Sequence, residues 1–502
     1  MLRLSSFVLF AALSAANLTS QIQHFSARLT GDQETPPVAT AASGFAIVSV
    51  DTTTSRVDVF AYGVGLTAVA AHLHSGAIGA AGPIVLPLTG GPQQWTGSLV
   101  LPAATIAAIQ AGNTYVNLHT AANPGGEIRG QVLTESTTRF TALLDGSQET
   151  PPNGSAATGV MTVFLHEPSH VLVYEMNTSG VAATAAHIHV GAAGIAGPIL
   201  VPLNGTSPRW CGVSSRLSDA NVALLQSGGL YVNVHSAAFP GGEIRGQLRA
   251  DVADFTASLD GSQETPPVVT AALGRACIEL QPDGRVSYRV QATGLTATAA
   301  HFHNGLPGVA GPIVVPLAGG PTLWTGTSGV LTTTQIADLR AGRWYVNVHT
   351  AANPGGEIRG QILATNLPAT FGRGCPVGTA TTPEIGSLGN ACVGTGFVIT
   401  LSGAPIASPA VVLFGVSRDT LPSGARLPLT LAPIGAPDCF LFHDNPGISL
   451  SALTDALGCA RTTLPIPFLP AAPRLYAQWF VIAPGANPLG LASSNALDFQ
   501  VH

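Results

Sequence analysis

A histidine pair of the form His-x-His occurs three times in this 502-residue sequence, and one further histidine follows each pair at a similar distance. Imidazole nitrogen is a favoured ligand of Zn, Cu and Ni ions. The pattern therefore predicts one candidate metal site per set, with Cu or Zn as the bound ion. The nine residues are His72, His74 and His119, then His187, His189 and His235, and then His301, His303 and His349.

Strand geometry gives these histidines a common side. In an extended strand, side chains alternate between two faces, so His72 and His74 project from one face and Leu73 projects from the other. By the same rule His119 projects away from its apolar neighbours. We therefore expect the aliphatic side chains to form the core and the imidazoles to lie on the outer face or beneath a loop. If the two strands are neighbours, three imidazoles converge.

The pattern is similar to the copper ligands of Cu/Zn superoxide dismutase, which is itself a Greek-key sandwich. However, no His or Asp occurs from Ser75 to Leu118, so nothing supplies a bridging imidazole or a zinc subsite. Two other interpretations stay open: the histidines hydrogen-bond to loop carbonyls, as buried polar groups must, or they contact a ligand. The three copies do not decide between them, because a duplication carries structural and functional residues alike.

Other polar residues recur together with the histidines. The Gln33-Glu34 step before two prolines is predicted to anchor a turn. Glu and Arg also stand two apart on a predicted strand, so they share a face, which favours interstrand ion pairs or hydrogen bonds over a binding site. These pairs are Glu127 and Arg129, Glu243 and Arg245, and Glu357 and Arg359.

All these residues belong to a long internal repeat. DGSQETPP begins at Asp145 and at Asp260, GDQETPP begins at Gly31, and every copy ends in GGEIRGQ. Equivalent histidines are roughly 115 residues apart, which is too long for a solenoid unit and indicates domains in a row. We define modules 1, 2 and 3 as residues 22–134, 135–250 and 251–364, and the C-terminal domain as residues 365–502.

Short strands and turns dominate each module. FTASLDGSQETPP alternates and then reaches two prolines that cannot join a ladder. GPIVVPL is predicted to be a short buried strand, and the one plausible helix is a short one at Thr334–Leu339. The predicted fold class is all-β, with three tandem antiparallel Greek-key-like β-sandwich domains followed by a fourth, different β-sandwich domain.

The linked motifs QETPP, AHxH and GGEIRGQ resemble those of the CHRD domain, a chordin-type module. The resemblance extends over residues 24–364 in three copies. It implies an extracellular protein that binds a partner, and it implies no assigned enzyme activity.

Composition narrows the function further. The chain contains no Lys, which excludes Schiff-base and P-loop lysine chemistry. Its formal net charge is −6 and it has no basic run, so no nucleic-acid partner is expected. Residues 1–20 have the pattern of a signal peptide, with an apolar run from Phe7 to Leu13. No stretch is apolar for long enough to be a transmembrane segment, so we expect a secreted or cell-surface protein.

The six cysteines suit an oxidising compartment. Cys211 and Cys277 occupy non-equivalent positions in modules 2 and 3, and they either bridge those modules or are two buried thiols. The other four lie in the C-terminal domain and allow three pairings. They are Cys375, Cys392, Cys439 and Cys459.

The C-terminal domain continues the β pattern with short apolar runs such as 397–401, 410–414 and 475–482. Its histidines His443 and His502 are isolated, and no catalytic motif of the G-x-S-x-G or His-Glu-x-x-His type occurs. We expect its aromatic residues Tyr476, Trp479 and Phe480 to pack in the core or at its edge. The segment resembles a C-terminal domain of many secreted bacterial proteins, which implies an accessory, display or export-linked role.

These features favour a non-enzymatic binding protein whose three modules engage an extracellular protein or polysaccharide, so that weak single contacts add up by avidity. The first alternative is a transition-metal-binding or dismutase-like redox protein that uses the nine histidines. The second is a structural component of the cell envelope.

Overall fold

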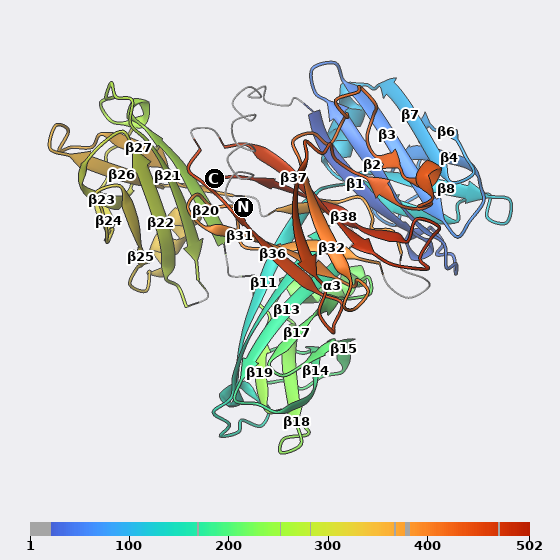
Figure 1. Cartoon of the computed structure of the whole chain (residues 1–502), viewed down its shortest axis with the longest axis horizontal. Helices are drawn as coiled ribbons and strands as arrows, with labels where there is room; N and C mark the ends of the chain where they lie inside the picture. Colours follow the sequence, from blue (N-terminus) through green and yellow to red (C-terminus); the bar gives the residue numbers. More distant parts are fainter. Residues whose placement is uncertain are drawn as a thin grey trace.

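The computed structural model describes residues 22–167, 170–250, 253–281, 283–365, 368–376, 382–469 and 472–502. Within these ranges every module forms its own curled antiparallel sheet, and the C-terminal domain contributes further sheets between the modules (Figure 1). The predicted all-β class with tandem sandwiches is therefore confirmed. The expected signal peptide and the expected module joint at Asp251 and Val252 lie outside the described residues.

Module 1 is one sheet folded over on itself, with the strand order β5-β4-β8-β9-β1-β2-β3-β7-β6. We call β1, β2, β3 and β7 the inner layer, and β4, β5, β8 and β9 the histidine layer. The elements are β1 (Ile22–Thr30), β2 (Ser43–Asp51), β3 (Arg56–Val64), β4 (Ala68–Ser75), β5 (Ile84–Pro87), β6 (Thr89–Gly90), β7 (Gln94–Val100), α2 (Ala103–Gln110), β8 (Thr114–Thr120), β9 (Ile128–Gln131) and β10 (Leu133–Thr134).

Modules 2 and 3 repeat this order, except that among the described residues module 3 has no strand equivalent to β6 and module 2 has none equivalent to β10. In module 2 the elements are β11 (Ser136–Asp145), β12 (Thr158–Glu167), β13 (Val171–Ser179), β14 (Ala183–Val190), β15 (Ile199–Pro202), β16 (Gly205–Thr206), β17 (Arg209–Val213), α3 (Asp219–Gln226), β18 (Leu230–Ser236) and β19 (Ile244–Gln247). In module 3 they are β20 (Ala253–Asp260), β21 (Leu273–Leu280), β22 (Val286–Thr293), β23 (Ala297–Asn304), β24 (Ile313–Pro316), β25 (Leu323–Thr327), α4 (Thr333–Arg340), β26 (Trp344–Thr350), β27 (Ile358–Gln361) and β28 (Leu363–Ala364).

Each module has its own apolar core, as expected for domains joined in a row. The predicted short helix is confirmed as α4, which begins after Thr332, and the Thr332 side chain accepts a hydrogen bond from the Gln335 backbone N–H. The prediction that GPIVVPL is a buried strand is wrong. It forms β24, which ends the sheet and has only β23 as a neighbour, so Ile313 stays 54% exposed.

The C-terminal domain packs a five-stranded sheet, β29-β38-β37-β32-β35, against a three-stranded sheet, β30-β31-β36. Trp479 is fully buried between them, and Tyr476 and Phe480 are also buried, as the sequence predicts. The elements are β29 (Ala369–Phe371), β30 (Glu384–Leu388), β31 (Gly396–Ser402), β32 (Pro409–Gly415), β33 (Leu429–Thr430), β34 (Phe440–Leu441), β35 (Ile448–Leu453), β36 (Ala460–Pro465), β37 (Arg474–Ile482) and β38 (Leu491–Gln500).

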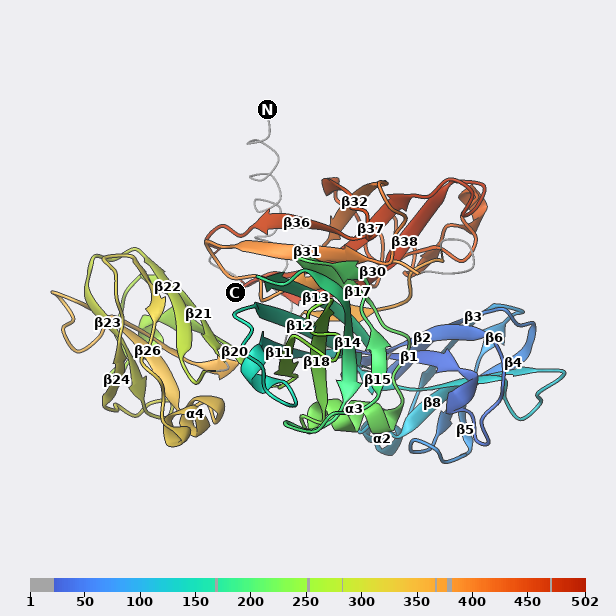
Figure 2. The same ribbon diagram turned by 90° about the horizontal axis from the view of Figure 1, so that it is seen from below.

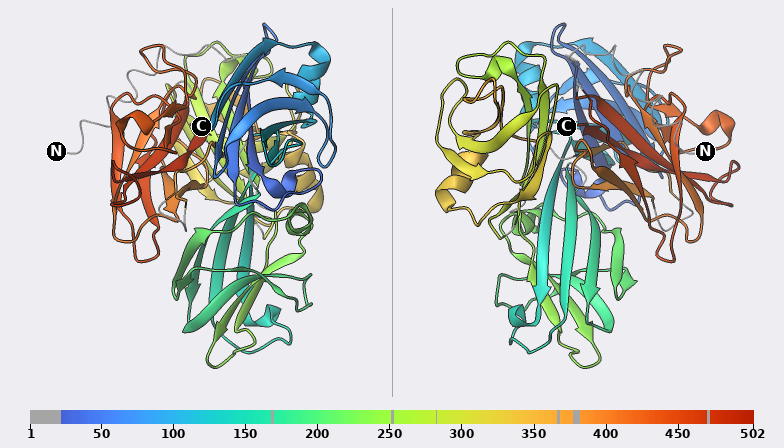
Figure 3. Two further views of the ribbon diagram at one scale, coloured as in Figure 1. Left: turned by 90° about the vertical axis from the view of Figure 1, so that its right-hand side faces the viewer. Right: turned by 60° about the vertical axis from the view of Figure 1, so that its left-hand side comes forward.

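The C-terminal domain contacts all three modules, which radiate from it in different directions (Figures 1 to 3). Module 1 meets it through an aromatic cluster in which Phe45 and Tyr62 pack against Phe440. The Tyr62 hydroxyl also donates to Asp438 at 2.6 Å. In every module the inner layer, which comprises β11, β12, β13 and β17 in module 2 and β20, β21, β22 and β25 in module 3, contributes to the contact.

Modules 2 and 3 are joined to the C-terminal domain by disulfide bonds. Cys211 on β17 pairs with Cys459, and Cys277 on β21 pairs with Cys392. Both predicted alternatives for Cys211 and Cys277, a bridge between modules and a pair of free thiols, are therefore wrong. The reason is that each cysteine lies on the outer face of an inner layer, and this face is covered by the C-terminal domain. The remaining pair, Cys375 and Cys439, closes within that domain.

Candidate functional site

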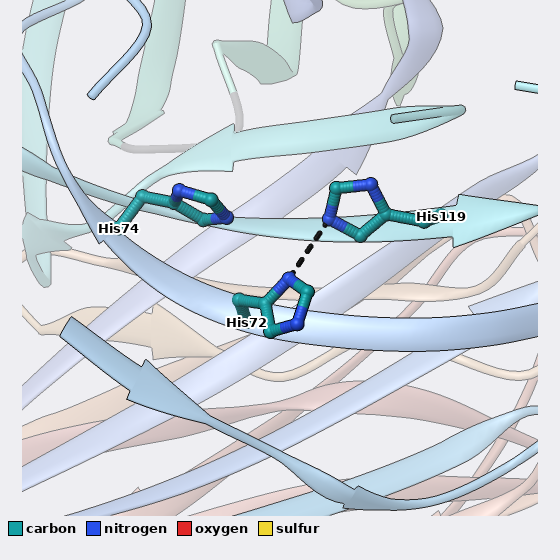
Figure 4. Close-up of side chains that lie close together, drawn as sticks. All are labelled: His72, His74 and His119. Atoms are coloured by element: carbon teal, nitrogen blue, oxygen red, sulfur yellow. Dashed lines mark hydrogen bonds between the residues drawn. The ribbon is translucent and has the colours of Figure 1, made fainter. Parts of the chain in front are cut away.

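The structure brings all nine predicted histidines together as three separate triads, one in the histidine layer of each module. β4 pairs antiparallel with β8, which places His72 opposite Asn117 and His74 opposite Tyr115. Leu73 is fully buried in the module core, so the predicted separation of aliphatic and imidazole faces is confirmed. Figure 4 shows the rings of His72, His74 and His119 converging from these two strands.

The imidazole nitrogens of a triad lie close to one another. In module 1, His72 Nδ1 is 3.0 Å from His119 Nε2. One ring nitrogen from each of the three residues falls within 4.8 Å of the others. Modules 2 and 3 repeat the closest contact at 3.2 Å between His187 and His235 and at 3.0 Å between His301 and His349.

Loop carbonyls orient two rings of each triad. His74 Nδ1 lies 3.0 Å from the carbonyl oxygen of Gly82, and His119 Nδ1 lies 3.0 Å from that of Pro124. A carbonyl only accepts, so both Nδ1 atoms carry the proton and both Nε2 atoms present a lone pair. The His74 Nε2 atom is buried without a hydrogen-bond partner, and so are the Nε2 atoms of His189 and His303.

A stack of three side chains holds His74 in place. Its ring is parallel to the ring of Tyr115, with the centroids 4.8 Å apart, and the Arg129 guanidinium lies 3.4 Å from the centroid of Tyr115. The Tyr115 hydroxyl accepts a hydrogen bond from the Gly82 backbone N–H. The role of Tyr115 does not follow from the sequence alone, although a Tyr recurs in every copy two residues before Asn.

The environment keeps the triad of module 1 neutral. Burial, followed by the neighbouring His119 and His74 rings, lowers the pKa of His72 below its ordinary value. Burial likewise lowers the pKa of His74 and that of His119, against the opposing effect of their carbonyl hydrogen bonds. The arrangement is therefore three uncharged nitrogen donors close together, which is the form of histidine that coordinates a metal ion.

The repeated modules match a known protein family. A sequence model of the CHRD domain matches residues 25–132, 140–248 and 255–362, so it covers most of the chain. The chain belongs to the CHRD domain family. The three matched segments lie within modules 1, 2 and 3, which we refer to below as CHRD modules, and the limits of these modules stay a prediction from the sequence.

Two curated relatives are chordins. The chain is 31% identical over 182 residues to chordin of Danio rerio, an alignment that covers 32% of this chain and 19% of the relative. It is 27% identical over 274 residues to chordin of Xenopus laevis, covering 48% of this chain and 28% of the relative. The alignments thus span less than a third of the length of either relative.

The similarities to solved structures are weak. A tetra-tandem repeat from the extending region of a large adhesion protein covers 90% of this chain and 96% of its own, with 12% identity and a TM-score of 0.13. A three-domain titin fragment covers 66% and 92%, with 8% identity and a TM-score of 0.12. Scores this low support no structural inference. The resemblance of the C-terminal domain to a domain of secreted bacterial proteins stays a prediction. Among the described residues, no helix combines the length and the apolar character needed to cross a membrane.

The Glu and Arg pairs at the end of each CHRD module do not form ion pairs with each other. Glu127 accepts hydrogen bonds from Thr40 and Thr120, whereas Arg129 donates to the carbonyl of Ala77 and stacks on Tyr115. The predicted hydrogen-bonding role is therefore confirmed for Glu127, while Arg129 supports the histidine layer. The corresponding contacts recur for Glu357 with Thr270 and Thr350, and for Arg245 and Arg359 over their tyrosines.

Glu34 has a larger role than the predicted turn anchor. Its carboxyl group is buried beside Asn117, which donates to Glu34 Oε2 at 3.3 Å. Glu34 Oε1 and Asn117 Oδ1 are both buried without a partner. A Cβ atom on Gly126, whose φ is +134°, would come within 2.6 Å of both oxygens, so only glycine fits there. A proton on Glu34 would give one of these two acceptors a donor.

We expect Glu34→Gln to remove a pH dependence of stability in module 1. Burial raises the pKa of Glu34 from its ordinary value of 4.5 to about 7, against the nearby Arg129 charge. Because the folded state then binds the proton more tightly, stability falls as pH rises from about 4.5 to about 7. Unfolding midpoints measured across this window should show a shallower decline for the variant. The matched variant Gln33→Glu, at the neighbouring side chain, should not flatten the decline, and an unchanged slope in Glu34→Gln would contradict the assignment.

Proposed function

We propose that this chain is an extracellular, multivalent binding protein that presents three equivalent CHRD surfaces to an extracellular protein partner. The observation that carries the proposal is that all three modules face the C-terminal domain with the same layer. Each inner layer faces the C-terminal domain, and the histidine layers lie on the far side of each module, at β4 and β8, at β14 and β18, and at β23 and β26 (Figure 1). One partner with repeated epitopes can therefore reach all three.

The exposed side chains favour a protein partner over a polysaccharide. Opposite His74, His189 and His303, the neighbouring strands expose Ile84, Ile199 and Ile313, and the loop before each of these strands exposes a second aliphatic side chain at a position that differs between the modules. Within the described part of the chain the exposed large hydrophobic residues are all Val, Ile or Leu. Stacking on sugar rings calls for exposed aromatic rings, whereas aliphatic patches with few charges are typical of protein contacts. We call this set the aliphatic face: Ile78 and Ile84, Ile195 and Ile199, and Leu306 and Ile313.

The test uses the intact chain as bait against the secreted proteins of its source, compared with a variant that carries Ile78→Ser, Ile195→Ser and Leu306→Ser. A captured protein should bind the intact chain roughly 10²- to 10⁴-fold more tightly than it binds this variant, because the avidity of the linked sites is lost when all three aliphatic faces are altered. The matched control is Leu453→Ser, an exposed aliphatic position on the C-terminal domain. Equal binding by all three baits, or retention only on polysaccharide, would overturn the proposal.

A further inference from the structure

We propose that each CHRD module binds one divalent transition-metal ion of the Cu or Zn type through three imidazole nitrogens. In module 1 the geometry points to His72 Nδ1, His74 Nε2 and His119 Nε2 as ligand atoms. Modules 2 and 3 offer the equivalent atoms. The proposal is independent of the protein partner proposed above, because it concerns what the triads hold and not what the modules contact.

The buried Nε2 atom of His74 supports a metal site, because it has no hydrogen-bond partner. His74 is only 9% exposed, and its Nε2 lone pair has no donor, because the proton of the ring is used on Gly82. A buried acceptor that stays unsatisfied destabilises the folded chain. The same atom is unsatisfied in His189 and in His303, so the arrangement belongs to the module and not to one copy. A metal ion at this point would use the lone pair.

The distances between the imidazole nitrogens also support a metal site. A tetrahedral ion with Zn–N or Cu–N bonds of about 2.0–2.1 Å separates its nitrogen ligands by roughly 3.3 Å. In module 1 one pair of nitrogens is already at 3.0 Å, and the largest separation within a triad is no more than 4.8 Å. Small rotations of the rings therefore bring all three nitrogens to bonding distance, while the strands stay paired.

The hydrogen bonds made by the other ring nitrogens also fit a metal site. Histidine ligands of metal ions donate their other ring N–H to a carbonyl or carboxylate, which fixes the tautomer. His74 and His119 already make these contacts with Gly82 and Pro124. Without an ion, the proton on His72 Nδ1 is donated to His119 Nε2. On binding, that proton moves to His72 Nε2, and its Nδ1 lone pair joins the other two.

The donor set selects the class of ion. Within the described residues, the groups close enough to share an ion consist of imidazoles alone in these three places. Neutral nitrogen donors suit Cu, Zn and Ni and do not suit Mg or Ca, which take oxygen ligands. A fourth cluster, formed by Cys211, Asp455 and Cys459, is excluded because its two thiols form a disulfide bond.

The test measures how many ions the full-length chain binds. Purified chain is stripped with a chelator, reloaded separately with Cu(II) and with Zn(II), freed of excess ion, and analysed by mass spectrometry of the elements. We expect three ions per chain, two in His74→Ala and none in the combined His74→Ala, His189→Ala and His303→Ala variant. His502→Ala, which changes a histidine outside the triads, should still bind three.

Two measurements distinguish a specific metal site from nonspecific binding of metal ions at the surface. In the Cu(II)-loaded chain, electron paramagnetic resonance should show splitting by several equivalent nitrogens, and this signal should fall by one third in His74→Ala. Near-ultraviolet circular dichroism must show that each variant is folded, and His74→Gln serves where His74→Ala fails to fold. Retention of fewer than one ion per folded chain, or the same number of ions in the combined variant, would overturn the proposal.

Discussion

Arg418→Ala should lower the free energy of unfolding by about 3–5 kcal/mol, because it leaves the buried Glu135 carboxylate without its cation. Arg418 donates two hydrogen bonds to Glu135, and the side chains of both residues are almost fully buried. The same guanidinium approaches Asp498 at 3.5 Å and lies over the ring of Phe371. Since Glu135 joins modules 1 and 2, the loss should loosen that joint from the C-terminal domain. Urea unfolding of the full chain measures the effect.

Arg474→Ala is the matched control for this prediction. Arg474 also pairs with Asp498, but its side chain is 57% exposed, so water replaces much of the interaction. We expect a loss of no more than about 1 kcal/mol. Replacing Arg418 and Glu135 together by Met should recover most of the stability, because no unpaired charge then remains. Equal losses in the two single Arg variants would show that the burial of Arg418 does not matter.

The fold of the modules follows from local patterns, which is why the sequence predicts it well. Period-two alternation around Leu73 assigns one face to the core, and β4 has that face buried. The capping threonines before Thr334 predict the start of α4, which begins after Thr332. The prediction for GPIVVPL fails because an apolar run does not tell whether a strand has a covering layer. The strand β24 ends its sheet, so its outer side chains stay exposed.

The triads are predictable for the same local reason, since His72 and His74 share a face whenever they lie on a strand. Their support was harder to predict. Tyr115 lies on β8, Arg129 lies on β9, and Glu34 follows β1. Only the tertiary structure shows that Tyr115 stacks on His74 and that Arg129 stacks on Tyr115. It also shows that Glu34 lies beside Asn117. The recurrence of Tyr, Arg and Glu in the sequence identifies these residues, but it does not show which side chains they contact.

The central position of the C-terminal domain could not be predicted from the sequence. It depends on contacts between residues hundreds of positions apart, such as Tyr62 with Asp438 and Cys211 with Cys459. Cysteine spacing restricts pairings only when the fold brings the positions within reach. Because Cys211 and Cys277 lie at different places in their modules, the disulfide bond to the C-terminal domain starts from a different strand in each, β17 in module 2 and β21 in module 3.

The double variant Cys211→Ser with Cys459→Ser should free module 2 from the C-terminal domain. The bond joins residues 248 positions apart, and closing so long a loop stabilises the folded chain by an amount on the order of 2–5 kcal/mol. What remains at the interface includes the ion pairs of Arg209 with Asp455 and of Arg461 with Glu175. Each pair has at least one side chain that is partly or largely exposed to water, which weakens the attraction, so each contributes about 1 kcal/mol. We therefore expect a larger radius of gyration in small-angle X-ray scattering.

Module 1 supplies the internal control for that experiment. It is held by the buried aromatic cluster around Phe440 and by the Arg418 pair, and neither depends on Cys211 or Cys459. The scattering curve should therefore fit a rigid module 1 and a mobile module 2, and each CHRD core should unfold as before. If the curve is unchanged, noncovalent contacts alone fix module 2. If it expands as expected, the disulfide bond sets the spacing of the three histidine layers, and binding to a partner with fixed epitope spacing should weaken in the same variant.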